Sequence, residues 1–245
     1  MPEAITLSGS PSQPLMLCLS GAGGLAHDWA RVAGHLGSGI HVVALQRPAR
    51  AESLVSATNQ VADFLTSQGS QTALLVGHSM GGFVAEATCR LHPGLVRGMV
   101  LVDSSVAQPS SALTAFTERA LQRSSRRVDD VLARLVPRNS ARSLQRLQVG
   151  ANDLMVYESW NDDLLRLRTQ QPLPEVPITV ITALRGGAPG RHTWARAQDG
   201  LVITLRADPR AVRVRHVVLR GAGHLVHLSH PAQVATEART LLDPE

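Results

Sequence analysis

The strongest chemical signal in this 245-residue sequence is the segment 77–81, Gly-His-Ser-Met-Gly, which follows the apolar run 72–76 and precedes a helical pattern. A G-x-S-x-G segment between a strand and a helix forms a sharp turn that exposes the serine hydroxyl above the sheet. The glycines remove side chains that would collide in such a turn, and the following helix N-terminus can stabilise negative charge. Ser79 is therefore predicted to be a nucleophile, and the alternative is a merely structural turn.

A serine hydroxyl becomes a good nucleophile when a base removes its proton, and ten histidines compete for this role. His224 ends the segment 220–224, Arg-Gly-Ala-Gly-His, directly after the last apolar run. A glycine-rich loop can turn the imidazole toward the serine, so His224 is predicted to be the general base, with His227 and His230 as alternatives. His78 precedes the nucleophile and is expected to pack beside it or to line the pocket.

A carboxylate is needed to hold the imidazole in the correct tautomer. The penultimate apolar run and the residues after it, 177–187, contain no Asp or Glu, whereas Asp103 ends the run 96–102. Neighbouring parallel strands are about 4.8 Å apart, so a carboxylate at that strand end can reach an imidazole above Ser79. Asp103 is predicted to be the acid. Asp199, another acid, a degenerate triad, or a loop-capping role for Asp103 remain alternatives.

The segment 20–24, Ser-Gly-Ala-Gly-Gly, follows the first strong apolar run. With the Ser79 turn and the loop that ends at His224, it makes the chain resemble the α/β-hydrolase-fold superfamily over nearly its whole length. The resemblance implies an oxyanion hole formed by the backbone N–H groups of Ala22 and Met80. Ser20 stands where the family usually has histidine, which matters little to backbone donors, and a plain strand-to-helix turn is the alternative for this segment.

Most members of that family carry the acid after the penultimate strand, and some branches carry it where Asp103 lies. The order Ser79, Asp103, His224 agrees with the family's order of nucleophile, acid and base. The resemblance is thus to a serine hydrolase branch whose triad acid follows the strand after the nucleophile. The segment 46–53 differs from the Asp-x-x-Gly-x-Gly-x-Ser loop of many relatives, which weakens any inference about the substrate.

Buried strands of a parallel sheet read as apolar runs without polar alternation, and such runs alternate here with helical patterns. The sequence therefore predicts an α/β fold with a doubly wound, mostly parallel sheet. Asp28 is expected to begin the first helix and Trp29 to pack. The predicted strands are 15–19, 40–45, 72–76, 96–102, 178–183 and 212–219, with a further one near 4–7; the predicted helices are 28–36, 53–67, 80–91, 192–206 and 231–242.

One segment interrupts this alternation. Residues 109–171 contain no strand-like run but show helical spacing of Leu and Val, and prolines bracket them. We predict a hydrolase core over 1–108 and 172–245 and a helical lid over 109–171. Eight arginines fall between Arg119 and Arg146. They form either an ordinary solvated helix face or a group from which one or two side chains hold a carboxylate, phosphate or sulfate of the substrate.

The composition excludes several classes of protein. The net charge is +5 and all 24 basic residues are arginine, but aromatic residues make up only 3%, too few for the stacking platforms of nucleic-acid binding. No apolar run approaches the roughly 20 residues needed to cross a bilayer. Cys18 and Cys89 are expected to be buried free thiols in a reducing compartment. With no signal-peptide pattern at the start of the sequence, we expect a cytoplasmic location.

Together these features predict a cofactor-free serine hydrolase that cleaves an ester, thioester or lactone through an acyl-enzyme, in the manner of a carboxylic ester hydrolase or thioesterase. No metal ion is expected, because no residues have ligand spacing. The expected partner is a small-molecule substrate, anionic or apolar, and not a nucleic acid or a membrane. The alternatives are an acyl-transfer, cyclisation or lyase enzyme on the same fold and a non-catalytic ligand-binding protein.

Overall fold

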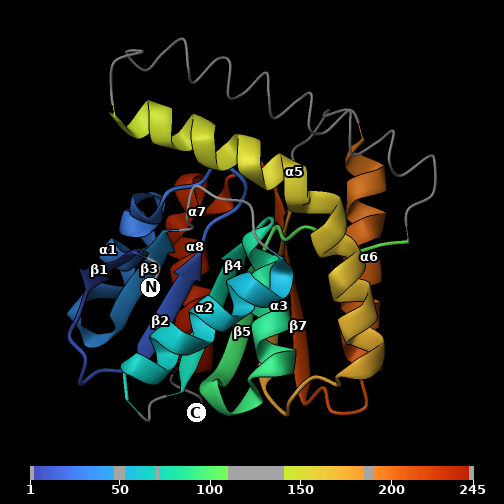
Figure 1. Ribbon diagram of the computed structural model, residues 1–245, viewed down its shortest axis with the longest axis horizontal. Helices are drawn as coiled ribbons and strands as arrows, with labels where there is room; N and C mark the ends of the chain where they lie inside the picture. The colour runs from blue at the N-terminus through green and yellow to red at the C-terminus, as the bar shows by residue number, and fades with distance from the viewer. Residues whose placement is uncertain (1–2, 47–52, 70–71, 110–140, 185–189, 243–245) are drawn as a thin grey trace.

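The apolar runs of the sequence form seven described strands of one sheet in the computed structural model (Figure 1). The structure describes residues 3–46, 53–69, 72–109, 141–184 and 190–242. The strand order is β1-β3-β2-β4-β5-β6-β7; β1 pairs antiparallel with β3, and the other neighbours are parallel. The strands are β1 Glu3–Ser8, β2 Leu15–Leu19, β3 His41–Gln46, β4 Ala73–His78, β5 Val96–Val102, β6 Pro177–Leu184 and β7 Arg213–Arg220.

Helices cover both faces of this sheet (Figure 1). Helices α1 and α8 pack on one face around the buried ring of Trp29, and α2, α3 and α6 pack on the other. The predicted doubly wound, mostly parallel α/β architecture is confirmed. The helices are η1 Ala26–Trp29, α1 Ala30–Leu36, η2 Gly37–Gly39, α2 Leu54–Ser67, α3 Gly81–Leu91, η3 Pro93–Leu95, α5 Ala141–Gln170, α6 Arg191–Ala207, α7 Val226–Ser229 and α8 Pro231–Leu242.

The strand positions agree with the sequence prediction because the central strands are covered on both sides. Every residue of β2, β3 and β4 is buried, which is why these segments carry no polar alternation. The edge strand β7 is only partly buried. The first helix differs from the prediction: it is preceded by the 3-10 turn η1, which begins at Ala26 and whose start is capped by a 2.8 Å hydrogen bond from the backbone N–H of Leu25 to the Asp28 carboxylate.

The segment predicted as a helical insertion contains α5, a helix of 30 residues. Figure 1 shows α5 beginning above the strand ends and continuing down beside the sheet. Asn161 of α5 fixes this helix to the end of the core, because its amide exchanges two 3.0 Å hydrogen bonds with the backbone of Gln108. Residues 110–140, with the leucine and valine pattern that indicated a helix there, lie outside the described residues.

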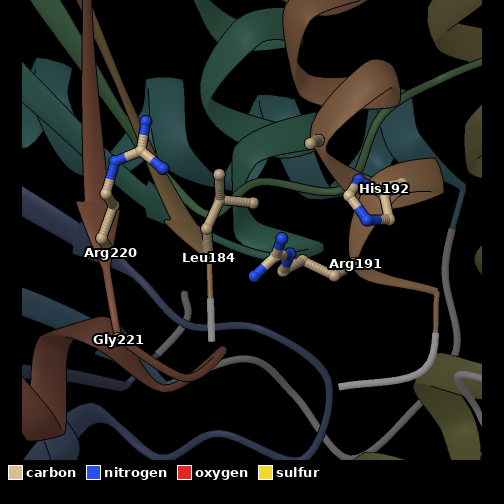
Figure 2. A pocket seen from close by; sticks show the side chains of 6 residues that line it. Leu184, Arg191, His192, Arg220 and Gly221 are labelled. Atoms are coloured by element: carbon tan, nitrogen blue, oxygen red, sulfur yellow. The ribbon is translucent and has the colours of Figure 1, made fainter. Parts of the chain in front are cut away.

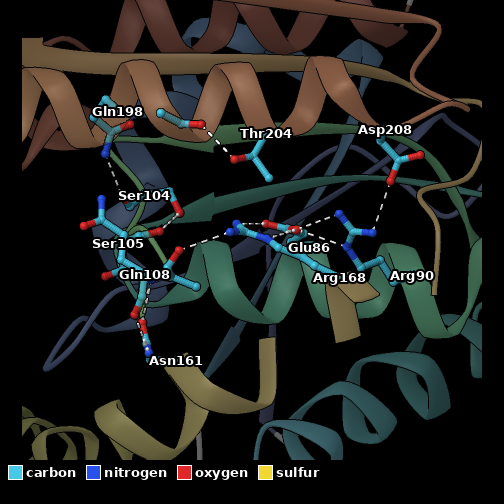
Figure 3. A network of polar contacts seen from close by, with 12 residues as sticks. Glu86, Arg90, Ser104, Ser105, Gln108, Asn161, Arg168, Gln198, Thr204 and Asp208 are labelled. Carbon is cyan, nitrogen blue, oxygen red and sulfur yellow. Dashed lines mark hydrogen bonds and ion pairs between the residues drawn. The ribbon is translucent and has the colours of Figure 1, made fainter. Parts of the chain in front are cut away.

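A buried network of charges joins α3, α5 and the end of α6 (Figure 3). Glu86 of α3 accepts two 2.8 Å hydrogen bonds from Arg168 of α5 and one of 3.0 Å from Arg90. Arg90 also lies 3.3 Å from the Asp208 carboxylate, and Arg168 donates to the backbone oxygen of Ala107 at 3.2 Å. The network therefore fixes α5 against α3, the helix that begins directly after the Ser79 turn.

Glu86 is 2% exposed, and burial alone would raise its pKa. The adjacent guanidinium groups of Arg168 and Arg90 outweigh burial and lower the pKa of Glu86 to about 2. The carboxylate is therefore ionised in the folded protein. Among the described residues it is the counter-charge of Arg168, and Arg90 shares it with Asp208.

Replacing Glu86 with glutamine should lower the free energy of unfolding by about 3–5 kcal/mol, because buried Arg168 loses the one carboxylate it pairs with among the described residues and Arg90 loses one of its two. Urea unfolding at pH 7 measures this loss. Glu158→Gln is the matched control, since Glu158 is exposed on α5, and it should change stability by no more than about 0.5 kcal/mol. Equal stabilities of the two variants would contradict the expectation.

The same substitution should show a specific pH dependence. Because the folded pKa of Glu86 lies near 2, below its ordinary value of 4.5, ionised Glu86 stabilises the fold fully above about pH 4.5. This contribution is lost as the pH falls toward 2. The unfolding free energies of the wild type and Glu86→Gln should therefore converge between pH 4.5 and 2, and a constant difference over that range would contradict the account.

Both cysteines are buried free thiols, as predicted. Cys18 lies in β2 and Cys89 in α3. Burial raises the pKa of both thiols, that of Cys89 to about 12, so neither is a thiolate near neutral pH. In the part of the chain that the structure describes, no helix has the length and apolar character required to cross a membrane.

Candidate active site

Ser79 lies on a tight turn between β4 and α3. Its φ of 50° is in the left-handed region, which non-glycine residues rarely adopt. The turn requires glycine at position 81, where a Cβ would lie 2.2 Å from the backbone oxygen of Leu19, and at position 77, where it would lie 2.6 Å from that of Gly81. The side chain of Ser79 is partly exposed between buried neighbours, so its hydroxyl is accessible from the strand ends.

The backbone of Ser79 is bound to the segment that carries Asp103. Its N–H donates to the oxygen of Val102 at 3.2 Å, and its oxygen accepts from the N–H of Ser105 at 3.0 Å. Asp103 also has a positive φ, 42°, and its N–H donates to the oxygen of Ile181 in β6 at 2.6 Å. Two residues with strained backbone conformations therefore lie side by side at the carboxyl ends of β4 and β5.

The Asp103 carboxylate is 1% exposed and accepts three hydrogen bonds. Its Oδ1 accepts from the backbone N–H of Ala183 and from the indole Nε1–H of Trp194, each at 2.9 Å. Its Oδ2 lies 2.7 Å from Nδ1 of His224. The structure thus brings the predicted acid and the predicted base into direct contact.

His224 lies on the loop after β7, and its side chain is 43% exposed. The loop docks on the Ser79 turn through His78, whose Nε2 lies 2.9 Å from the backbone oxygen of His224. The His78 and His224 rings pack with their centroids 4.7 Å apart. His78 therefore packs beside the nucleophile, in the position that the sequence indicated.

The two other candidate bases have different environments. His227 is 2% exposed and packs between the rings of Trp29 and His78, with centroid distances of 4.8 and 4.4 Å. Burial lowers its pKa to about 4, so it is neutral at pH 7. Nδ1 of His230 lies 2.9 Å from the hydroxyl of Ser229. Among the described residues, neither histidine shares a hydrogen bond with a carboxylate.

Asp199, the alternative acid, is exposed on α6, and its carboxylate lies 3.9 Å from Nδ1 of His216. The structure does not bring it to His224. Among the described residues, no three His, Cys, Asp or Glu side chains are grouped as a metal site requires.

The glycine-rich segment after β2 crosses directly over the Ser79 turn. A Cβ on Gly21 would lie 2.7 Å from Cβ of Ser79 and 2.8 Å from Nδ1 of His78, so only glycine allows this approach. Ala22 follows at the next position, and Met80 begins α3. No described residue accepts a hydrogen bond from the backbone N–H of Ala22 or Met80.

Ser20, where the family usually has histidine, stabilises the start of this segment. Its hydroxyl accepts a 3.0 Å hydrogen bond from the indole of Trp29 and donates to the backbone oxygen of Leu25 at 3.2 Å. Trp29 is fully buried, as predicted, and its polar atom has a partner. Asp28 lies within the first helical turn, Ala26–Trp29, and does not begin it.

Sequence reasoning missed a second role of Asp28. Its two carboxylate oxygens accept 2.8 and 3.0 Å hydrogen bonds from Arg146 of α5, which also donates to the backbone oxygen of Gly23 at 3.3 Å. Asp153 of α5 accepts from the N–H of Gly23 at 2.9 Å. Helix α5 is thus bound to the segment that carries Ala22. These partners lie 118 to 130 residues apart, so no local spacing signals the contact.

This pairing gives one arginine of the arginine-rich segment a role that neither interpretation of that segment includes. Arg146 is neither an ordinary solvated side chain nor a free cation for a substrate, because Asp28 neutralises it. The other seven arginines lie in the undescribed segment or have undescribed side chains.

A hollow of about 440 Å³ lies where β6 and β7 end and α6 begins. Figure 2 shows it from close by, with Arg191, His192 and Arg220 among the side chains around it. The described lining contains no carboxylate. Arg220 and Gly221 begin the loop that ends at His224, so the hollow adjoins the candidate site. The described lining residues are Leu184, Arg191, His192, Ala195, Arg220 and Gly221.

Comparisons with known proteins agree with this geometry. The model of a family described as the alpha/beta hydrolase family matches residues 16–238. No curated protein sequence matches the chain.

Several solved structures are similar in fold. The carboxylesterase CesB of Bacillus subtilis is 18% identical, with a TM-score of 0.64 over 100% of this chain and 93% of that one. The thioesterase domain from the curacin biosynthetic pathway is 20% identical, with a TM-score of 0.63 over 98% and 100%. Cfl2 from Burkholderia cenocepacia is 17% identical, with a TM-score of 0.68 over 98% and 91%. At these identities the likeness concerns the fold.

Proposed function

The chain belongs to the alpha/beta hydrolase family, and we propose that it is a cofactor-free serine hydrolase that cleaves a carboxylic ester, thioester or lactone with Ser79, His224 and Asp103. The observation that carries this proposal is the 2.7 Å contact between the Asp103 carboxylate and Nδ1 of His224, on a loop docked against the Ser79 turn. A buried acid in contact with an imidazole, beside the turn of a partly exposed serine at one edge of the sheet, supports acyl transfer by these three residues.

In the proposed reaction, Oγ of Ser79 attacks the carbonyl carbon while Nε2 of His224 takes the hydroxyl proton. Asp103 holds Nδ1–H of the imidazole and stabilises the imidazolium that forms. The N–H groups of Ala22 and Met80 donate to the oxyanion of the tetrahedral intermediate. The imidazolium then protonates the leaving alcohol or thiol. Water, deprotonated by His224, attacks the acyl-enzyme and releases the acid.

We infer that residues 109–171 form a lid over this site and that 1–108 and 172–245 form the core. Two observations on the described part, α5, support this division. Its first half is bound through Arg146 and Asp153 to the segment that carries Ala22. Its second half is anchored at the core boundary through Asn161 and Gln108.

The substrate that we propose is a small molecule, anionic or apolar, and two arginines of the hollow beside the His224 loop would suit the anionic alternative. Arg191 and Arg220 line it without a described acidic partner, and guanidinium groups bind carboxylates and phosphates well. Amides are poorer candidates than esters, because their leaving group must be protonated more completely. The two buried free thiols support the cytoplasmic location inferred from the sequence.

Two other functions remain as alternatives to be tested: acyl transfer, cyclisation or lyase chemistry on the same fold, and ligand binding without turnover. A structural neighbour is named as a thioesterase domain and another as a carboxylesterase. In type II thioesterases the acid usually follows the penultimate strand. Here neither β6 nor the residues directly after it, up to 187, include an Asp or Glu. This favours an esterase that uses Asp103 over a type II thioesterase.

A small substrate panel tests the proposal. Purified protein should release p-nitrophenol from p-nitrophenyl butyrate, a thiol from an acyl thioester, or a hydroxy acid from a lactone. For the ester and the thioester, one acid should form for each leaving group released. A matched pair of esters, one with a terminal carboxylate and one with its methyl ester, tests the anionic preference.

The outcome of the panel separates the alternatives. Formation of a new ester or amide when an alcohol or amine is added would favour acyl transfer. No turnover of any ester, thioester or lactone would contradict the hydrolase proposal and favour a ligand-binding protein. The Ser79→Ala variant, prepared in parallel, controls for contaminating esterases.

A further inference from the structure

Trp194 of α6 contacts both the acid and the base of the proposed triad. Its indole Nε1–H donates to Oδ1 of Asp103 at 2.9 Å, and its ring meets the His224 imidazole edge-on with centroids 6.1 Å apart. We propose that Trp194 is a positioning residue that fixes the Asp103 carboxylate for His224. This inference rests on the proposed function and assigns a role to a residue that the proposed mechanism does not use.

The hydrogen bonds on Asp103 explain why a second donor is needed. Each carboxylate oxygen has two lone pairs. The Ala183 N–H and the Trp194 indole N–H occupy those of Oδ1, so Oδ2 is left for His224. Without the indole donor, the buried carboxylate would be free to rotate about its Cβ–Cγ bond and would lose a charge-assisted hydrogen bond.

Helix α6 is itself fixed next to Asp103. Gln198 is one helical turn beyond Trp194 and is fully buried. Its Nε2 donates to the backbone oxygen of Ser104 at 2.6 Å, as Figure 3 shows, and its Oε1 accepts from Thr182 of β6 at 3.4 Å. Side chains four residues apart on one helix face therefore bind neighbouring residues of the segment after β5. This pairing gives the indole a defined position.

The strain at Asp103 makes such support necessary. A non-glycine residue with a φ of 42° keeps that conformation when its surroundings impose it. The backbone contact of Asp103 with Ile181 and the side-chain contacts with Ala183 and Trp194 come from two neighbouring elements, β6 and α6. The indole is the part of this support that also touches His224.

Loss of the indole donor should weaken the hydrogen bond between Asp103 and His224. A carboxylate that can rotate about its Cβ–Cγ bond holds the Nδ1–H of His224 less firmly. Among the described residues, the titratable groups that face His224 are Asp103 after β5 and His78 of β4, with His227 of α7 behind His78. The substitution of Trp194 leaves all three in place.

The test is Trp194→Phe, supported by benzothienylalanine at position 194, which keeps the shape of indole but lacks its N–H. We expect kcat for the best ester to fall about 5- to 30-fold with KM within twofold, because the donor acts on the triad and not on binding. The Nδ1–H resonance of His224, followed by NMR, should move upfield, because a carboxylate that is free to rotate holds this proton less firmly.

Thr193→Ala is the matched control, because Thr193 is the exposed neighbour of Trp194 on α6. It should behave as the wild type. Folded Trp194 variants with unchanged kcat and an unchanged His224 Nδ1–H resonance would overturn the inference, and so would equal losses in the Thr193 control.

The NMR measurement needs no turnover. If the wild type hydrolyses nothing but the His224 Nδ1–H resonance still moves upfield in both Trp194 variants, the proposed function fails and the positioning of Asp103 stands.

Discussion

The substitution Ser79→Ala should lower kcat/KM for ester hydrolysis by at least about 10⁴-fold, because no other group can form the acyl-enzyme. The fold should be retained, since alanine removes one partly exposed oxygen and keeps the left-handed backbone conformation of the turn. Steady-state kinetics of the purified variant, with circular dichroism to verify folding, measure this loss.

A serine on α5 provides the control for this experiment. Ser159 is exposed on α5, where its hydroxyl donates only to the backbone oxygen of Val156 among the described contacts. Ser159→Ala should retain wild-type kinetics. Residual activity of Ser79→Ala above about 1% of the wild type would point to a different nucleophile.

The second large effect is expected for Asp103→Asn, which should lower kcat by about 10³- to 10⁴-fold. The surrounding groups determine how the new amide is oriented. Its oxygen must face the two donors, Ala183 N–H and Trp194 Nε1–H, so its NH₂ faces Nδ1 of His224. Nδ1 must then accept, which places the imidazole proton on Nε2, the atom that has to take the serine proton. The wrong tautomer is thus imposed, and the base is lost.

Asp199→Asn is the matched control because it makes the same chemical change on an exposed aspartate that faces His216. Its kcat should stay within about twofold of the wild type. Loss of activity in Asp199→Asn alone, with Asp103→Asn fully active, would exclude Asp103 as the acid.

The sequence predicted those features that depend on local geometry. The Ser79 turn was recognisable because its glycines at 77 and 81 must stand at fixed positions relative to the serine. The central strands were recognisable because both of their faces are buried. Asp103 and His224 were accessible to prediction because parallel strands end at one edge of the sheet, which limits where catalytic side chains can gather.

Contacts between distant segments were not predictable in the same way. Trp194 is 91 residues from Asp103, and Arg146 is 118 residues from Asp28. A tryptophan or an arginine on a helix gives no sign of which carboxylate it will meet, because that depends on how the helices pack on the sheet. The buried partners of Glu86 were missed for the same reason: a charged residue within a helix usually indicates a solvated face.

The most direct test of the account is labelling with a fluorophosphonate at neutral pH, followed by mass spectrometry of the intact protein and its peptides. An activated serine attacks the phosphorus and displaces fluoride, so the account predicts one adduct per chain, located on Ser79. The adduct should be absent from Ser79→Ala and form much more slowly in Asp103→Asn. A folded wild-type protein that gains no adduct on Ser79 would contradict the assignment of this residue as the nucleophile of a serine hydrolase.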